Sequence, residues 1–497
     1  MPLVNLIAEG VGPFQSLDLD LSDGKGQPHL GPHILAGVNG SGKSTILRTI
    51  AWVLDRGHRG FPYDDWHQML RGYGASRALL VIRPHGLPPY VWACSKGRGD
   101  QVTADLKEWA RFSAAKVIGD ASIFGSAVEI APETAYTAQK ATGEGWGGYE
   151  VMSMSIQGPK PNTAWLRFPG TGAPGMDPPG RVFNYAAYSP SKALRHLSEP
   201  DLSTTLSDAD QNCLAFESTV QNESIQSWLL SLYSKRAIAR ERDQTGERYT
   251  QSLGRFEAAL RSIYDQRVKF EVEIEPRFQP RLRMLGRSLN FSQLPDGVRS
   301  TVAWVADFMM REDRVDWNPA LSGRRPGVLL LDEIDAHLHP YWQRRLLPAM
   351  REALPDVQII ATSHSPFVIS SCPGSRVHVL DLDADGRARV RPPVDAPIGE
   401  SVTTTLKEIF GVDSRFDILT ERELNEWNEL KKREAKGASP PADSTRLKDL
   451  TRTLSERSEE LRALVAAPLA MPKAVLDDLL GSDRPDGASP KRPKKRA

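Results

Sequence analysis

The chain has 497 residues, of which 40% are hydrophobic and 25% are charged. These fractions are close to the averages for soluble globular proteins, so they exclude collagen-like and wholly disordered chains and allow a sizeable core. The 63 basic and 62 acidic residues nearly cancel, giving a formal net charge of +1. A nucleic-acid partner would therefore have to meet a local basic patch, because the surface as a whole is not basic.

The cysteines and the hydrophobic pattern predict a cytoplasmic protein without a membrane partner. Cys94, Cys213 and Cys372 lie far apart and form no CxxC pair, which disfavours a disulfide framework or a zinc knuckle. The first residues, MPLVNLIAEGVGPFQ, lack the charged and apolar regions of a signal peptide. No apolar stretch approaches the ~20 residues that a membrane-spanning helix needs.

The first half of the chain combines predicted strands and helices with an irregular region. Residues 1–56 read as strand, hairpin, strand, loop and helix, and residues 75–95 resume strand character. Residues 96–180 are rich in Gly and Pro, which predicts a variable insertion with exposed loops. A buried strand is expected at 181–189, and helical spacing extends from about 205 to 266.

The second half reads as an α/β arrangement followed by charged helices. Residues 327–331 and 357–361 are short apolar runs with the pattern of buried parallel strands. The other expected elements are a strand at 268–275, helices at 298–310 and 340–354, a hairpin at 376–392 that turns at Asp385 and Gly386, and charged helices from 402 to about 465.

The strongest chemical signal is the run GVNGSGKST at residues 37–45, which fits GxxxxGK[ST] between an apolar strand and a helix. Glycines let the backbone wrap around a phosphate without Cβ clashes, while loop N–H groups and the helix N-terminus supply partial positive charge. Lys43 reaches the β- and γ-phosphates, and the Ser44 hydroxyl ligates Mg²⁺. The residues predicted to bind a nucleotide are Asn39, Gly40, Ser41, Gly42, Lys43, Ser44 and Thr45.

Two further candidate residues follow predicted buried strands. The run at 327–331 delivers Asp332 to a strand end beside the phosphates, where a carboxylate can hold Mg²⁺ through water. Glu333 comes next and can polarise an attacking water as general base. After the second strand, in the run ATSHSP, His364 can contact the γ-phosphate or that water. The alternatives are structural, namely an acidic strand-end cap and a packing histidine.

This ordered series resembles the ABC-type AAA ATPases of the SMC, RecF and OLD-like group, above all in LLLDEIDAHLHPYWQRRLLPAM and the following ATSHSPFV. The resemblance implies an α/β P-loop ATPase head, with a mixed or parallel core sheet flanked by helices, that binds ATP and Mg²⁺. In this group a signature loop of one subunit completes the nucleotide site of another. That property implies a homodimer or higher oligomer joined through the ATP sites.

The matching signature segment is NFSQLPDGVRS at 290–300. Where the group has LSGG or LSDG, this chain has Pro295 in place of the serine that touches the partner's γ-phosphate, a departure that bears on the hydrolysis rate. Asp296 and Gly297 are the trans residues that the resemblance implies. The helix N-terminus that follows can still present N–H groups to an anion. A plain Pro-Asp-Gly turn is the alternative.

The runs LPDGVRSTVAWVADFMMR, DEIDAHLHP and IGESVTTTLKEIFGVDSR together resemble the PtuA family, the ATPase subunits of Septu-type anti-phage systems that also occur beside some retrons. The resemblance covers roughly residues 1–55, 181–195 and 265–415. It implies an ATP-binding dimer that works with a separate HNH nuclease, similar to PtuB. It also implies that Asp335 lies in a loop that crosses the dimer interface; the alternative is that Asp335 caps the helix near Pro340.

On this basis the two parts of one ATPase head are expected to lie far apart in sequence, with an insertion between them. The expected parts are the N-terminal part of the head with the phosphate loop (1–95), a variable insertion (96–180), a strand plus helical insertion (181–266), the C-terminal part of the head with signature, Walker B motif and switch histidine (267–400), a charged helical region (401–480) and a disordered basic tail (481–497).

Four other features have a structural interpretation. His337 and His339 lack further ligands for a metal site. The aspartates at 381–386 lack the Glu of a complete Ca²⁺ loop, and a β-hairpin turn explains them, which leaves no nuclease centre in the chain. Gln68 is a candidate lobe-linking residue with an exposed polar residue as the alternative. The basic residues at 491–496 contact DNA or RNA, or form a solvated tail.

The leading functional hypothesis is a defence ATPase whose nucleotide state controls an associated HNH nuclease. The alternative is a RecF- or SMC-like DNA-repair ATPase that acts on DNA directly. A transporter subunit is a third interpretation, which the atypical signature and the large insertions disfavour. A neighbouring HNH gene favours the first hypothesis, and a neighbouring permease gene the third.

Overall fold

The computed structural model describes residues 3–55, 76–83, 90–96, 100–118, 128–130, 163–168, 184–189, 213–214, 216, 222–242, 245–264, 268–275, 278–284, 286–315, 317, 321–412, 416–435 and 440–466. The chain divides into two compact units, Met1–Thr405 and Leu406–Ala497. Gln68, the tail at 481–497 and much of the region 96–180 lie outside the described residues. Within the described ranges, no helix is both long and apolar enough to cross a membrane.

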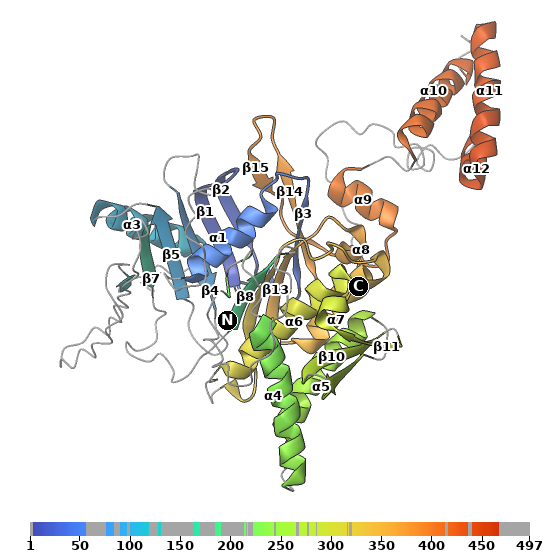
Figure 1. Cartoon of the computed structure of the whole chain (residues 1–497). Helices are drawn as coiled ribbons and strands as arrows, with labels where there is room; N and C mark the ends of the chain where they lie inside the picture. The colour runs from blue at the N-terminus through green and yellow to red at the C-terminus, as the bar shows by residue number, and fades with distance from the viewer. Residues whose placement is uncertain are drawn as a thin grey trace, which may run out of the picture. The chain divides into compact units, whose positions relative to one another are not determined.

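A parallel sheet built from distant segments forms the centre of the first unit (Figure 1). Its parallel strands, in spatial order, are β14 (Arg376–Leu382), β3 (His33–Gly37), β13 (Val357–Thr362), β12 (Gly327–Leu331) and β8 (Asn184–Tyr188). β15 (Ala388–Val390) and β16 (Val394–Asp395) pair with β14 in the antiparallel sense. The predicted strands at 327–331 and 357–361 are therefore confirmed. Because the five strands are parallel, their carboxyl ends meet at one edge.

Helix α1 (Lys43–Asp55) lies between this sheet and a second, antiparallel sheet. The second sheet consists of β2 (Phe14–Asp20), β1 (Leu3–Val11), β4 (Arg77–Ile82), β5 (Tyr90–Lys96), β7 (Thr163–Phe168) and β6 (Val128–Ile130), in that order. Leu47 and Ile50 of α1 share one buried cluster with Leu6 of the second sheet and Leu330 of the parallel sheet. The two sheets thus hold α1, and the loop before it, from both sides.

Two segments of the region 96–180 belong to this layered structure. Helix α3 (Asp100–Ile118) covers the other face of the second sheet, where Leu106 and Trp109 pack with Val4. Trp109 Nε1 donates to Glu9 Oε1 over 2.8 Å. Strand β7 pairs with β5 along its length. The expectation of irregular loops is therefore wrong for these two segments, because α3 buries apolar side chains against the sheet and β7 hydrogen-bonds to β5.

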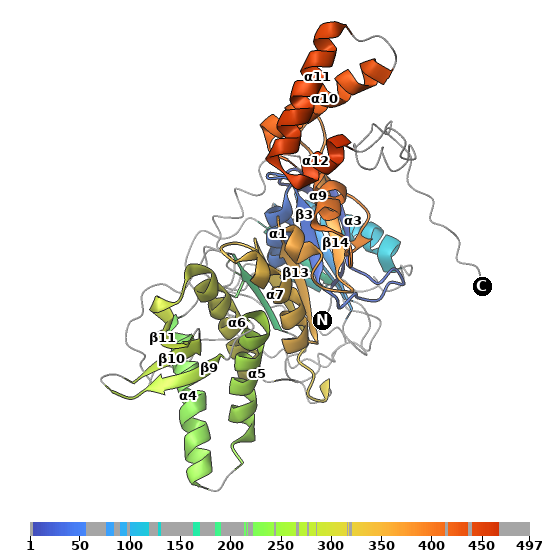
Figure 2. The ribbon, with the colours of Figure 1, turned by 90° about the vertical axis from the view of Figure 1, so that its right-hand side faces the viewer.

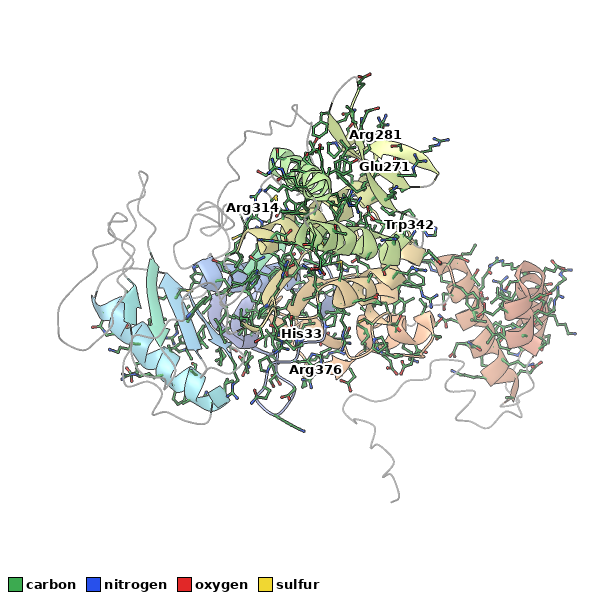
Figure 3. All side chains as sticks on the ribbon, turned by 90° about the horizontal axis from the view of Figure 1, so that it is seen from below. His33, Glu271, Arg281, Arg314, Trp342 and Arg376 are labelled. Carbon is green, nitrogen blue, oxygen red and sulfur yellow. The ribbon has the colours of Figure 1, made fainter. Side chains whose placement is uncertain are left out.

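Helices also cover the face of the parallel sheet opposite α1. They are α6 (Asp296–Arg314), α7 (Pro340–Ala353) and the short α8 (Pro366–Ile369). The predicted helices at 298–310 and 340–354 are confirmed by α6 and α7. Against α7 lies α5 (Glu247–Tyr264), and Figure 3 shows Trp342 at this contact, where its ring meets the edge of the Tyr264 ring at a centroid distance of 5.0 Å.

A helical hairpin and a small sheet extend from this side of the first unit. The hairpin is formed by α4 (Asn222–Glu241) and α5, which lie side by side in Figure 2. The small sheet consists of β9 (Lys269–Glu273), β10 (Gln279–Met284) and β11 (Arg287–Asn290), all antiparallel. The 3₁₀ turn η2 (Phe291–Gln293) follows β11 and leads into α6. The predicted strand at 268–275 is confirmed by β9.

The ends of the strands away from the phosphate loop enclose a buried polar cluster. His33 Nδ1 lies 3.0 Å from His378 Nε2, and the Gln358 side chain exchanges hydrogen bonds with the backbone of Leu3. Burial lowers the pKa of His378 to about 3 and holds the pKa of His33 well below its usual value. Both imidazoles are therefore neutral at neutral pH. Figure 3 places His33 near Arg376, at the start of β14.

The second unit is a small helical bundle. Helix α9 (Val402–Phe410) crosses the division between the units, and α10 (Ile418–Ala435), α11 (Pro441–Arg457) and α12 (Glu459–Ala466) follow. Trp427, Leu450 and Leu454 are part of its buried core. Ion pairs such as Arg446 with Glu426 lie on its surface. The predicted charged helices are confirmed by α9, α10, α11 and α12.

Candidate nucleotide-binding site

The phosphate loop joins the end of β3 to the start of α1. Gly40 and Gly42 have φ angles of +80° and +90°, a region that side chains rarely adopt. A Cβ at Gly42 would lie 2.5 Å from the Phe14 ring, so the turn between β1 and β2 presses directly on the loop. Lys43 Nζ donates to the carbonyl oxygens of Gly37 (3.0 Å) and Val38 (2.9 Å), which places its charge inside the loop.

Carboxylates near the loop act on the same lysine. Burial lowers the pKa of Lys43, and the negative charges of Asp332, Glu333 and Asp335 oppose that shift. Asp332, predicted from the second half of the chain, meets the phosphate loop from the first half through a hydrogen bond from Ser44. The sheet order brings about this meeting, because β13 separates β3 from β12 and all three strands end at the same edge.

Ser44 and Asp332, the two predicted magnesium ligands, are hydrogen-bonded to each other. Ser44 Oγ donates to Asp332 Oδ1 over 2.9 Å, although the two residues are 288 positions apart in sequence. A hydroxyl and a carboxylate oxygen in contact are hard oxygen donors of the kind that Mg²⁺ prefers. The arrangement brings the predicted phosphate loop and the predicted Walker B residue together.

Thr362 ties this pair to the next residue of the Walker B motif. Its hydroxyl donates to Asp332 Oδ1 (2.7 Å) and accepts the backbone N–H of Glu333 (2.7 Å). The Thr362 residue is only 1% exposed. Thr362 lies in the run ATSHSP, for which the sequence predicts a role of His364 alone. The signal was present, since a hydroxyl residue at a buried strand end beside a Walker B strand is placed to bind its carboxylate.

Glu333 leaves the strand in a left-handed conformation, with φ of +48°. Its backbone is held by Thr362, and the residue is exposed. Beside it is a pocket that encloses about 320 Å³, including space open to solvent. Its walls include Tyr188, Ser300 and Trp304, together with Asp332 and Glu333 themselves. The carboxylate of Glu333 is therefore free to meet water.

His364 lies at the same edge, after the end of β13. Its backbone N–H donates to Asp335 Oδ1 over 3.3 Å. Partial burial lowers the pKa of His364, and the positive charge of Lys43 lowers it further against the nearby carboxylates. A lowered pKa keeps the imidazole neutral at neutral pH, so one ring nitrogen can accept and the other can donate a hydrogen bond.

The signature segment begins helix α6. Asp296 is the first residue of the helix, its side chain is 76% exposed, and it forms an ion pair with Arg299. Gly297 is buried, and the backbone of His337 lies so close that an added Cβ would be 2.2 Å from the His337 carbonyl oxygen. The outward-facing residues of the turn are therefore Pro295 and Asp296. Gly297 packs beneath the loop that follows the Walker B motif.

That loop, residues 335–338, has a fixed shape. His337 has φ of +60°, and Leu338 N donates to Asp335 O over 3.2 Å. The alternative interpretation of Asp335, as the cap of α7, is wrong, because His339 is the N-cap and its side chain accepts from Tyr341 N. The Asp335 carboxylate instead accepts the N–H of His364. His339 thus has a structural role, and no metal-binding group of three His, Cys, Asp or Glu residues exists in the described ranges.

The residues present suit a nucleotide with Mg²⁺. Ser41 Oγ lies in the phosphate loop, is buried, and has no hydrogen-bond partner in the part of the chain that the structure describes. A buried polar atom without a partner is costly, and a phosphate oxygen is a suitable acceptor for it. At Gly40 an added Cβ would meet nothing within 4 Å, so the loop is open on that side. Mg²⁺ commonly uses one or two protein oxygens plus phosphate oxygens, which Ser44 and Asp332 match.

Comparison with known proteins identifies relatives of this chain. The protein family described as "AAA domain, putative AbiEii toxin, Type IV TA system" matches residues 224–370. The chain is 36% identical over 115 residues to the Septu protein PtuA of Bacillus thuringiensis, covering 21% of this chain and 29% of PtuA. These matches support the expectation of an ABC-type AAA ATPase related to PtuA.

Two retron proteins are further relatives. The "Retron Vc95 probable ATPase" of Vibrio cholerae serotype O1 biovar El Tor is 29% identical over 123 residues, which are 24% of this chain and 23% of that protein. The "Retron Ec83 probable ATPase" of Escherichia coli is 24% identical over 404 residues, 74% of this chain and 69% of that protein. The matches to the Vc95 protein and to PtuA thus span less than a third of those proteins.

Among solved structures, the chain is similar to heads of SMC proteins. The SMC head domain from Thermotoga maritima is 16% identical, with a TM-score of 0.37, over 79% of this chain and 99% of that chain. An SMC head bound to the C-terminal winged-helix domain of ScpA is 13% identical, with a TM-score of 0.41, over 80% of this chain and 98% of that chain. These low TM-scores add no evidence on function.

Proposed function

We propose that this chain binds and hydrolyses ATP as the dimeric ATPase subunit of a bacterial anti-phage defence system, in which the nucleotide state controls an associated HNH nuclease. One observation carries the enzymatic part of the proposal. The hydrogen bond between Ser44 and Asp332 joins a phosphate loop to a Walker B strand across 288 residues of sequence. Both motifs keep their mechanistic residues, so the site has the parts that ATP hydrolysis needs.

Nucleotide binding follows from the loop and from two oxygen donors. Lys43 and the N–H groups at the start of α1 supply positive charge to the phosphates. Ser44 and Asp332 would hold Mg²⁺, which would neutralise negative charge on the phosphates. Thr362 keeps the Asp332 carboxylate turned toward Ser44, since it donates to the same oxygen that accepts from Ser44. Ser41 offers the phosphates a further hydroxyl.

Hydrolysis uses the exposed groups at the strand ends. Glu333 accepts a proton from the attacking water as general base. Its left-handed backbone turns the side chain out of the strand direction, and Thr362 fixes that turn. The neutral His364 donates a hydrogen bond to the γ-phosphate or orients the same water. Both residues lie where nucleotide state can be transmitted to the neighbouring loop 335–338.

The second copy supplies the other side of the site. The start of α6 and the loop 335–338 are in contact within one chain, at Gly297 and His337. Together they form one surface that carries Pro295, Asp296 and Asp335. We propose that this surface faces the nucleotide held by the partner copy, with N–H groups at the α6 N-terminus directed at the phosphates. Pro295 offers no hydroxyl there, so hydrolysis is slow and the ATP-bound dimer is long-lived.

The role in defence rests on the relatives, which are named as Septu and retron proteins. The test is purification of the tagged chain from its native operon, with mass spectrometry of the proteins that accompany it, beside plaque assays of the same operon. We expect a co-purifying HNH nuclease, and a loss of protection with Lys43→Ala. Protection that is unchanged by Lys43→Ala would contradict control by nucleotide. Direct DNA binding with no nuclease partner would favour the RecF- or SMC-like alternative.

A further inference from the structure

The side chain of Gln343, on the first turn of α7, connects three segments of the candidate site. Gln343 Nε2 donates to the carbonyl oxygens of Asp335 and Leu338, each over 3.0 Å. Gln343 Oε1 accepts from Ser365 Oγ over 2.7 Å. Both amide hydrogens and the amide oxygen are therefore used.

Only one orientation of the amide fits these contacts. A flipped amide would place Oε1 against two carbonyl oxygens, and Nε2 against the Ser365 hydroxyl. Ser365 is itself committed, because its oxygen accepts the backbone N–H groups of Phe367 and Val368 and so caps α8. Gln343 thus bonds to Ser365 through its amide oxygen and to two loop carbonyl groups through its amide nitrogen.

The segments joined by Gln343 have different functions in the proposed mechanism. Ser365 directly follows His364, whose own N–H donates to the Asp335 carboxylate. The loop 335–338 packs on the signature helix, because the carbonyl oxygen of His337 lies against Gly297. A displacement of His364 is therefore passed to the loop, and through the loop to the start of α6.

We propose that Gln343 is a positioning residue that couples nucleotide contact at His364 to the surface that receives the second copy. The inference rests on the proposed function, since it assumes an ATP-dependent dimer. In this role Gln343 makes no contact with ATP. The phosphate loop and the Ser44–Asp332 pair share no hydrogen bond with it, so binding of ATP to one chain does not require it.

The test compares two affinities in a Glu333→Gln background, which slows hydrolysis. Gln343→Met keeps the length and helix propensity of the side chain but removes all three hydrogen bonds. Gln343→Glu keeps the acceptor for Ser365 and loses both donors to the loop. Gln251→Leu, on the exposed surface of α5, is the matched control, since among the residues that the structure describes its amide donates only to Glu247. ATP affinity is measured with a fluorescent ATP analogue, and the dimer dissociation constant by sedimentation velocity.

We expect both Gln343 variants to keep the ATP affinity within about twofold and to weaken the dimer by at least about tenfold, the range of ordinary allosteric coupling. The control should change neither constant. A dimer of unchanged affinity in both variants overturns the inference while the proposed function stands. An equal loss of ATP affinity also overturns it, because Gln343 would then support the whole site. Failure of Glu333→Gln alone to dimerise with ATP overturns the proposed function, and this inference with it.

Discussion

The two sides of the candidate site are held in different ways. One side, the cis side, consists of the phosphate loop and the strand ends of a single chain, at the edge of a sheet buried between helices. Its residues hydrogen-bond to one another or to the phosphate loop; they are Lys43, Ser44, Asp332 and Thr362. On the other side, Pro295 and Asp296 face outward from the start of α6, and the loop beside them is held by hydrogen bonds from Gln343 and from the backbone of His364.

This difference indicates which part of the site one chain builds alone. The cis side is preorganised, so nucleotide and Mg²⁺ can bind without reordering it. The outward side has N–H groups and an exposed carboxylate but no phosphate loop of its own to face. In the proposed dimer a second copy would provide such a loop, and the following variants separate the two sides.

The largest effect is expected from Glu333→Gln. The amide cannot accept the proton of the attacking water, so ATP turnover should fall by about 10²–10⁴-fold, the usual contribution of a general base. ATP affinity should be kept, because the magnesium ligands and the phosphate loop are untouched. Turnover is measured by phosphate release at saturating ATP. Exposed Glu400→Gln is the control, and turnover near that of the unchanged protein in Glu333→Gln would exclude Glu333 as the base.

Lys43→Ala should break the cis side alone. It removes the charge that faces the β- and γ-phosphates, and a lost charge-assisted contact of about 3 kcal/mol weakens ATP binding by about 100-fold. The dissociation constant for a fluorescent ATP analogue measures the effect. Lys25→Ala, on the exposed turn after β2, is the matched control. An affinity that is equal in the two variants would contradict the assignment of the phosphate loop.

Lowering the pH tests the buried histidine in the sheet that supports the cis side. Burial lowers the pKa of His378 to about 3 in the folded chain, whereas an unfolded histidine titrates near its ordinary value of about 6.5. Between these values the unfolded state binds more protons, so the free energy of unfolding falls as pH falls below about 6.5 and stops falling near pH 3.

The loss between about pH 7 and pH 4 should be about 3 kcal/mol for His378 alone. Urea denaturation of the first unit at the two pH values measures it. In His378→Gln the part of the loss that belongs to this imidazole should disappear, while the part that belongs to His33 remains. If the acid loss is as large in His378→Gln as in the unchanged chain, the buried neutral state of His378 is wrong.

A pair of glycine substitutions tests the contact beneath the outward side. In Gly297→Ala the new methyl would lie 2.2 Å from the backbone oxygen of His337, and overpacking of this kind costs about 1–3 kcal/mol. Gly254 lies within α5 and has nothing within 4 Å of an added Cβ, so Gly254→Ala should stabilise by about 1 kcal/mol. Urea midpoints measure both; a neutral Gly297→Ala would mean that the loop is free to move away.

Much of the cis side could be predicted from the sequence, because it is encoded in contiguous runs. A glycine-rich loop between strand and helix and acidic residues after an apolar strand have local patterns that fix their chemistry. The parallel strands at 327–331 and 357–361 are likewise visible as apolar runs. The meeting of Ser44 and Asp332 then follows from where parallel strands end.

The contacts that hold the outward side could not be predicted in the same way. Gln343 is a polar residue on a helix, and nothing in its neighbourhood reveals that its amide meets Asp335, Leu338 and Ser365. The burial of Gly297 depends on the left-handed backbone of His337, which is rare for a residue other than glycine. The packing of α3 on the second sheet joins it to Val4 at the start of the chain as well as to the nearby strands β4 and β5. Such contacts are set by tertiary structure and leave no local pattern.

In the proposed dimer, one chain builds the cis side of an ATP site and a second copy completes it. Sedimentation velocity of Glu333→Gln with and without Mg²⁺-ATP tests this most directly, with Glu333→Gln combined with Lys43→Ala as the control. We expect Glu333→Gln to be a monomer without ATP and a dimer with ATP, and we expect no ATP-dependent dimer in the control. A Glu333→Gln chain that binds ATP and remains a monomer at saturation would contradict it.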